Sequence, residues 1–331
     1  MAIATTPKVD IERFNEEGYL VVDDVLDLQR DLDPVMAEYT ALLDELASRW
    51  HAEGKLTSTY AELPFVQRLA HVLSEMGTKA YQHFDISLAF SGVTEETPIH
   101  LGPAVFGLLS SPRLMDAVEQ LIGPEILSNP IQHVRIKPPE RLLPPEFRGS
   151  LVGQTDWHQD QGVALPEVDE TEMLTVWLPI TDATEENGCL CVVPRSYQRG
   201  LVAHCSAQKG SSRTGLHIPD SIRGPDFTPV PIKRGGVLFL HRRTMHASLR
   251  NMSDGVRWSF DLRYQPIGQP TGRPWFPSWV VRSRKSPDSA VTDWRVWADL
   301  WRGARSHLTT NPPTGKFNRW TGDEPICAEN L

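Results

Sequence analysis

The sequence predicts a mainly β protein with helical additions, in which one antiparallel β core carries N-terminal helices on its outside. The first third of the chain has apolar residues at helical spacing. From Ile126 onward, short runs of Val, Ile, Leu and aromatic residues are bounded by Gly, Pro, Asn and Asp. The composition, 40% hydrophobic and 23% charged, is that of an ordinary folded protein. Many short strands within one half of a chain favour a closed or sandwiched antiparallel sheet.

The helices are expected from periodicity and from start and stop signals. Between Asp31 and Trp50, apolar residues recur at spacings of three and four, which is typical of an amphipathic helix. Ser111-Pro112 is a helix start, and Gly123-Pro124 is a helix stop. Helices are therefore expected over residues 9–18, 31–50, 64–76, 100–110 and 112–122.

The strands are expected where branched and aromatic residues cluster. Residues 19–26 form a strand that enters a turn, and the core strands are expected over residues 131–136, 173–180, 190–193, 237–241, 246–249 and 256–264. We expect a single domain over residues 1–331, with helical support over about 1–124, the β core over 125–265 and a Trp-rich C-terminal extension over 266–331.

Three tryptophans in this extension share a helix face. Trp294, Trp297 and Trp301 are spaced by three and then four residues. We expect this face to dock on the β core. The alternatives are a contact between two copies of the chain in a homodimer, or an aromatic lid over a substrate.

Charge and cysteine content narrow the classes of function. Lys+Arg 33 against Asp+Glu 42 gives a net charge of −9, which disfavours nucleic acid as a partner. No apolar stretch is long enough for a membrane helix. Four cysteines are too few for a disulfide framework, and Cys189 and Cys191 are expected to be small buried residues. Since the first residues also lack a secretory signal, we expect a cytoplasmic protein.

A short segment, Trp157-His158-Gln159-Asp160-Gln161, offers two metal ligands. Residues two apart in an extended segment project from one face, so the imidazole of His158 and the carboxylate of Asp160 would converge. The pattern is common, however, and an exposed loop pair or a simple His–Asp hydrogen bond would also produce it.

A third ligand candidate follows later in the chain. Residues 235–248 read as a turn, a buried strand, a tight connection and a further strand that begins at His246. Two histidines and one carboxylate form the facial triad of non-haem Fe(II) oxygenases, which leaves coordination positions open. Zinc accepts the same ligands in hydrolases, so the ligands alone do not choose the metal.

An arginine lies in an otherwise apolar strand just beyond His246. A buried charge needs a partner, and the planar guanidinium of Arg257 suits a carboxylate. That carboxylate could belong to a bound molecule or to an Asp or Glu of the chain in a structural ion pair.

With these residues in this order, the chain resembles the phytanoyl-CoA dioxygenase family of Fe(II)- and 2-oxoglutarate-dependent oxygenases. Four motifs carry the resemblance besides His158-x-Asp160 and Arg257. The first two are F-x-x-x-G-Y at 14–19, and a strand with an acidic turn at 176–190 that ends in E-N-G-x-L. The other two are the stretch 193–197, in which Tyr197 replaces the usual His, and His246-x-Ser248 followed by Asn251. The resemblance covers about residues 10–265.

The resemblance implies a double-stranded β-helix, which is a cupin-like jelly roll. It implies His158, Asp160 and His246 as catalytic iron ligands, and Arg257 as the residue that binds the distal carboxylate of 2-oxoglutarate. Lys137 resembles a residue of the family whose side chain can reach the co-substrate.

Gln132, on the opposite face of the same expected strand, is a further co-substrate candidate. His241 is the alternative to His246 as the third metal ligand. Only His246 is followed by Ala-Ser, as in the family motif, so we expect His241 to have a structural role.

The implied function is a dioxygenase that uses Fe(II), 2-oxoglutarate and O2 to hydroxylate a C–H bond of a small organic molecule or acyl thioester, with release of succinate and CO2. Because Asp160 is retained, hydroxylation is favoured over halogenation, for which related enzymes replace the carboxylate. Two alternatives stay open: a Zn- or Mn-dependent cupin-like hydrolase or isomerase, and a non-catalytic metal-binding scaffold.

Overall fold

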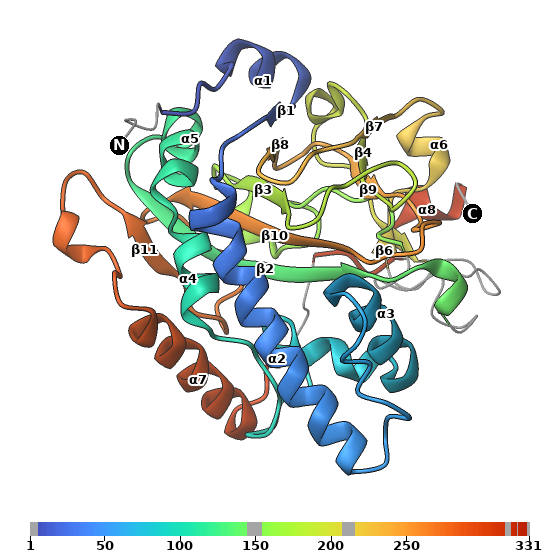
Figure 1. The fold of residues 1–331 in the computed structure, drawn as a ribbon. Coiled ribbons are helices and arrows are strands. Elements are labelled where there is room, and N and C mark those ends of the chain that lie inside the picture. The colour runs from blue at the N-terminus through green and yellow to red at the C-terminus, as the bar shows by residue number, and fades with distance from the viewer. Residues whose placement is uncertain (1–5, 144–153, 207–215, 315–318, 323, 330–331) are drawn as a thin grey trace.

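The computed structural model describes residues 6–143, 154–206, 216–314, 319–322 and 324–329. Its centre is a jelly roll of two antiparallel sheets, with most helices packed on one side (Figure 1). The helices are α1 (Ile11–Glu17), α2 (Asp33–Ala52), α3 (Phe65–Met76), α4 (Pro103–Leu109), α5 (Pro112–Ile122), α6 (Asp220–Arg223), α7 (Trp294–Thr310) and α8 (Pro325–Glu329). The strands are β1 (Tyr19–Val22), β2 (Ile126–Lys137), β3 (Leu174–Pro179), β4 (Leu190–Val192), β5 (Cys205–Ser206), β6 (Leu216–His217), β7 (Thr228–Val230), β8 (Val237–His241), β9 (His246–Ser248), β10 (Arg257–Pro266) and β11 (Trp279–Arg282).

The larger sheet has six strands in the order β1-β8-β3-β10-β2-β11, and the smaller sheet has the order β7-β4-β9. β5 and β6 pair separately. All the pairings are antiparallel. The fold class expected from the sequence is therefore confirmed, and β1 at the N-terminus joins the edge of the larger sheet.

Both faces of the larger sheet are covered, which explains why β3 is buried along its whole length and is mostly apolar. Val176 and Leu178 of β3 belong to the core shared with the helices, whereas Trp177 between them packs with residues of the smaller sheet such as Leu190 and Val230. The alternation along one strand therefore serves two separate cores.

Helix α2 is the main support of the sheet on the helical side. Its buried residues follow the expected spacing of three and four. Tyr39 lies fully buried against Trp258 of β10, with ring centroids 4.7 Å apart, and its hydroxyl donates a hydrogen bond to the Phe84 carbonyl (2.9 Å). In Figure 1 the helix crosses the sheet diagonally, in line with these contacts.

β2 differs most from the expectation, because it begins at Ile126 rather than near residue 131. Its pairing with β10 shifts between Asp261, opposite His133, and Arg263, opposite Asn129. Extra residues of β2 bulge out at this point, and Pro130 fits there because proline cannot donate a ladder hydrogen bond. Because the bulge interrupts the regular alternation of side chains, the sequence pattern did not indicate the first part of β2.

The tryptophan face of α7 is buried inside the chain, which excludes Trp297 and Trp301 as a dimer contact. Trp297 packs on Phe106 of α4, with centroids 5.9 Å apart, and Trp301 packs on Phe276, at 5.8 Å. The face therefore packs on α4 and on the Phe276 segment, within the same core cluster as residues of β10 and β11.

One disulfide, between Cys205 and Cys327, joins β5 to α8. The sequence, with too few cysteines for a disulfide framework, gave no indication of this single bond. The two cysteines are 122 residues apart, so only the tertiary fold brings them together. Cys189 and Cys191 are buried and unpaired, as expected. Within the described ranges, no helix combines the length and apolar character that a bilayer crossing requires.

We expect Trp297→Ala to lower the free energy of unfolding by about 3–5 kcal/mol, because a large buried ring would leave a cavity between α7 and α4. Val296→Ala, on the exposed face of the same helix, is the matched control and should change it little. Urea denaturation measures both. A Trp297→Ala protein with unchanged stability and a raised substrate KM would favour the lid instead.

Candidate metal centre and adjoining cavities

His158 and His246 face each other across an isolated antiparallel bridge. The backbone N–H of each donates to the carbonyl oxygen of the other, at 3.0 Å in both directions. Side chains of directly opposed residues in an antiparallel pair project on the same side. The two imidazole rings accordingly lie with centroids 4.1 Å apart.

Asp160 reaches the same point from a turn, whereas the sequence predicted that it would lie with His158 on an extended strand. Its Oδ1 lies 3.7 Å from Nε2 of His158, and its Oδ2 lies 3.8 Å from Nε2 of His246. One ligand atom from each of the three residues lies within 4.8 Å of the others. The structure therefore brings together the three residues that the sequence singled out.

The backbone sets the orientation of both imidazoles. Nδ1 of His158 lies 2.8 Å from the carbonyl oxygen of Asp156, and Nδ1 of His246 lies 3.0 Å from that of Thr244. A carbonyl only accepts hydrogen bonds, so each Nδ1 carries the proton and each Nε2 keeps a free lone pair directed at Asp160. Two neutral nitrogen donors and one carboxylate fit a divalent iron ion.

The carboxylate of Asp160 is held by a buried arginine and a threonine. Arg263 donates to Oδ1, and the Thr175 hydroxyl donates to Oδ2. Burial would raise the pKa of Asp160, but the nearby Arg263 and His246 hold that pKa well below its usual value. Asp160 is therefore an anion in a fixed position, as a metal ligand must be.

Arg257 lies beside this cluster and is 2% exposed. It lines a small cavity together with His158, His246, Arg135 and other residues. Within the described part of the chain, no carboxylate lies within 4.0 Å of its guanidinium, which instead donates to the Gly188 carbonyl (3.2 Å) and the Ser259 hydroxyl. Burial lowers the pKa of Arg257 to about 10. A buried cation without an anionic partner favours an anionic ligand over the structural ion pair.

Lys137, Gln132 and His241 lie outside the residues that line this cavity. The Lys137 ammonium donates to the Ser248 hydroxyl (2.7 Å) and to a backbone carbonyl. The Gln132 amide donates to the Ile86 carbonyl (2.9 Å), and so connects β2 to the helical support. His241 accepts at Nδ1 from the backbone N–H of Arg243 (3.1 Å), a structural contact.

A larger cavity of about 360 Å³ also borders on His158. Its lining is mainly apolar and includes Phe90, Ile131 and Phe276. Arg135 and Asp261, like His158, border both cavities. A molecule in the larger cavity would therefore lie next to the candidate metal centre.

Arg135, Asp261 and Thr175 also lie at the site and were not expected there from the sequence. Arg135 precedes Lys137 by two residues in β2, so regular alternation places both side chains on one face and was a usable signal. Asp261 and Arg263 in β10 are charged residues in a buried strand, which is the argument that singled out Arg257. No local signal marked Thr175.

Known proteins resemble this chain in sequence and in fold. A model of the phytanoyl-CoA dioxygenase family matches residues 14–259. Phytanoyl-CoA dioxygenase domain-containing protein 1 of Danio rerio is 23% identical over 289 residues, which cover 84% of this chain and 96% of that protein. Its Mus musculus relative is 29% identical over 41% of this chain and 46% of that protein. Among solved structures, the non-heme monooxygenase ThoJ in its apo form has a TM-score of 0.50 at 18% identity, over 92% of this chain and 99% of that chain, which shows the shared fold.

We expect the metal-free protein to lose stability as the pH falls from about 6.5 towards 4. Burial lowers the pKa of His204 to about 3, and that of His241 and of His246 to about 4. Unfolded histidines titrate near 6.5, so in this window the unfolded chain binds more protons and is favoured. Each histidine contributes up to about 1.4 kcal/mol per pH unit.

The measurement is urea denaturation at pH 7.5 and at pH 5.5, above the range in which most carboxylates titrate. His241→Gln should reduce the difference between the two pH values, because it removes one of the three groups. Equal free energies of unfolding at both pH values would contradict this expectation.

Proposed function

This chain belongs to the phytanoyl-CoA dioxygenase family of Fe(II)- and 2-oxoglutarate-dependent enzymes, and on that premise we propose that it hydroxylates a C–H bond of a small, largely apolar organic molecule or of the acyl part of a thioester. One observation carries the proposal. The cluster of His158, Asp160 and His246 adjoins two cavities: His158 and His246 line the small cavity with the unneutralised arginine, and His158 also lines the larger apolar cavity.

In this proposal His158, Asp160 and His246 hold Fe(II). Bound there with 2-oxoglutarate and O2, iron would supply the oxidising power that turns C–H into C–OH while 2-oxoglutarate becomes succinate and CO2. The chain contributes the fixed lone pairs of the two imidazoles and an ionised carboxylate. Retention of the Asp160 carboxylate supports hydroxylation over halogenation, as argued from the sequence.

Arg257 binds the distal carboxylate of 2-oxoglutarate in this proposal. It is buried, it lines the small cavity with both histidines, and Trp177 covers one side of its guanidinium, 5.4 Å from the ring centroid. A planar guanidinium can bind a carboxylate through two parallel hydrogen bonds. Arg135, on the border of both cavities, is the next candidate for a contact with the co-substrate.

The larger cavity accepts the molecule that is oxidised. Its volume of about 360 Å³ is in the lower part of the range of small-molecule sites. Phe90, Phe276 and Ile131 exclude water from an apolar substrate, and the shared residue His158 sets the end at which its reactive carbon lies. A bulky headgroup such as that of a thioester would extend into solvent.

We expect Ala substitution of His158, Asp160 or His246 to abolish succinate formation from 2-oxoglutarate, because each removes one of three protein ligands. Succinate release and bound iron are measured together on folded protein. His307→Ala, an exposed histidine on α7, is the control and should behave like the unmodified chain. Substrate turnover without 2-oxoglutarate would favour a Zn- or Mn-dependent hydrolase or isomerase, and metal binding without any turnover would favour a scaffold.

We expect Arg257→Lys to weaken 2-oxoglutarate binding by about 10- to 150-fold, because one charge-assisted hydrogen bond is worth about 1.5–3 kcal/mol. Arg257→Ala should weaken it further. Iron content should not change in either variant, since the guanidinium of Arg257 donates to Gly188 and Ser259 and offers no ligand atom to a metal. Calorimetry on anaerobic Fe(II) protein gives the affinity, with the exposed Arg302→Ala as control. If Arg257→Ala binds 2-oxoglutarate normally, the role passes to Arg135.

A further inference from the structure

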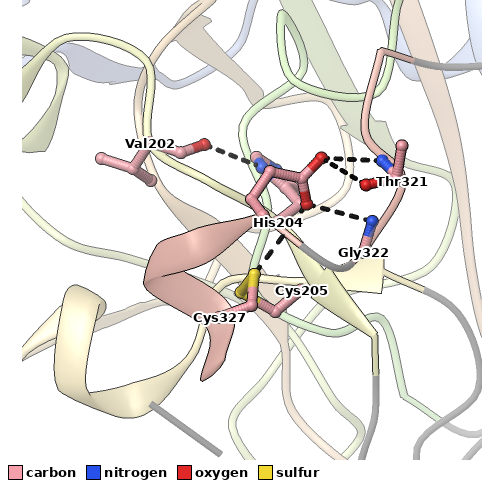
Figure 2. Close-up of a disulfide and its surroundings, with 7 residues drawn as sticks. Val202, His204, Cys205, Thr321, Gly322 and Cys327 are labelled. Carbon is pink, nitrogen blue, oxygen red and sulfur yellow. Dashed lines mark hydrogen bonds between the residues drawn. A yellow bond between two sulfur atoms is a disulfide. The ribbon is translucent and has the colours of Figure 1, made fainter. Parts of the chain in front are cut away.

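His204 is a buried histidine that contacts the backbone between two of the proposed ligands. Its Nε2 accepts a hydrogen bond from the N–H of Gln159 (3.0 Å), the residue between His158 and Asp160. Its Nδ1 lies 3.0 Å from the carbonyl oxygen of Val202, so Nδ1 carries the proton and Nε2 is the acceptor (Figure 2).

The side chain of Gln159 ties the same segments together a second time. Its amide donates to the carbonyls of Gly200 (2.8 Å) and Arg243 (2.7 Å), and its oxygen accepts from the N–H of Val202 (2.9 Å). The His204 ring also lies so close to Gly162 that a Cβ added there would be 2.3 Å from the imidazole. The turn that carries Asp160 is thus shaped by residues 200–204.

The C-terminal residues 319–322 and 324–329, here called the tail, cover another side of His204. The Trp320 ring stacks on the imidazole, with centroids 5.4 Å apart and planes 17° from parallel. The backbone N–H of Ser206 donates to the carbonyl of Gly322 (3.2 Å), which continues the contact along β5. His204 is therefore held between the Gln159 backbone and the tail.

The disulfide anchors the tail at this place. Cys205 directly follows His204, and Figure 2 shows its bond to Cys327 in α8. Helix α8 has five residues, too few to be stable without tertiary contacts. The bond closes a loop of 122 residues, and so removes much of the freedom of a detached tail.

We propose that His204 is a positioning residue for the metal ligands, that the disulfide-tethered tail holds it in place, and that opening the Cys205–Cys327 bond weakens metal binding. The inference rests on the proposed function, because it takes His158 and Asp160 as ligands. A dithiol reductant opens the bond. The disulfide gains two electrons and two protons and becomes two thiols, while the two thiols of the reductant form a disulfide.

The first test is the affinity of the full chain for Co(II), a spectroscopic probe for the iron site. Cys327→Ser, His204→Ala and Trp320→Ala should each raise the dissociation constant, by about 10- to 100-fold for the loss of a supporting contact. The disulfide is removed by the substitution Cys327→Ser and not by a dithiol reductant, because dithiols bind metal ions and would disturb the Co(II) titration. Leu300→Ala, exposed on α7, is the control and should leave the constant unchanged.

The second test is deuterium exchange of the Gln159 amide in the metal-free chain. We expect faster exchange in His204→Ala, Cys327→Ser and Trp320→Ala, because the hydrogen bond to the imidazole is lost or loosened. A general loss of stability would speed exchange throughout the chain. Faster exchange confined to the peptide around Gln159 therefore supports the positioning role of His204. Faster exchange throughout the chain would overturn that role.

Normal Co(II) affinity and normal Gln159 exchange in both Cys327→Ser and Trp320→Ala would overturn the inference. Should Cys327→Ser fail to fold, Trp320→Ala decides, because it leaves the disulfide intact. The variant Asp160→Ala shows whether the role of the tail or the proposed metal site is at fault. If that variant keeps its Co(II) affinity, the proposed metal site is wrong. If it loses the affinity while the tail variants do not, only the role of the tail is wrong.

Discussion

The pair of backbone hydrogen bonds between His158 and His246 is the contact on which the site depends. His246 begins β9 in the smaller sheet, whereas His158 belongs to a loop that this bridge, together with neighbouring backbone hydrogen bonds, attaches to the sheet edge. The bridge places both imidazoles on one side, and local carbonyls then fix which nitrogen faces the centre. Because Asp160 follows in an unpaired turn, its position needs other contacts, and Gln159, His204 and Arg263 supply them.

Charged residues of alternating sign connect the two cavities. Arg135 lies 3.9 Å from Asp261, Asp261 lies 3.1 Å from Arg263, and Arg263 donates to Asp160. Each carboxylate in this row is neutralised by a neighbour, which permits burial next to an apolar cavity. Arg257 stands apart from the row, since no carboxylate among the described residues lies within 4.0 Å of it. The arrangement leaves one buried cation available for an anionic ligand.

Much of the fold could be predicted because burial on one face imposes a period. The spacing in α2 predicted its buried face, which includes Tyr39 and Leu43, and the apolar runs located β3, β8 and β10. The beginning of β2 could not be predicted, since a bulge interrupts its alternation. The packing partner of Trp297 could not be predicted either. The spacing of the tryptophans shows that they share a helix face, but it does not show which element packs against that face.

The sequence by itself determined the ligand types, their order and the buried arginine, because these depend on residue identity and on short spacings. Only the tertiary structure decided that Asp160 lies in a turn held by Arg263, 103 residues away, and that Arg135 borders both cavities. It alone paired Cys205 with Cys327 and set Trp320 on His204. Contacts between residues far apart in the chain form when whole elements pack, so no local pattern records them.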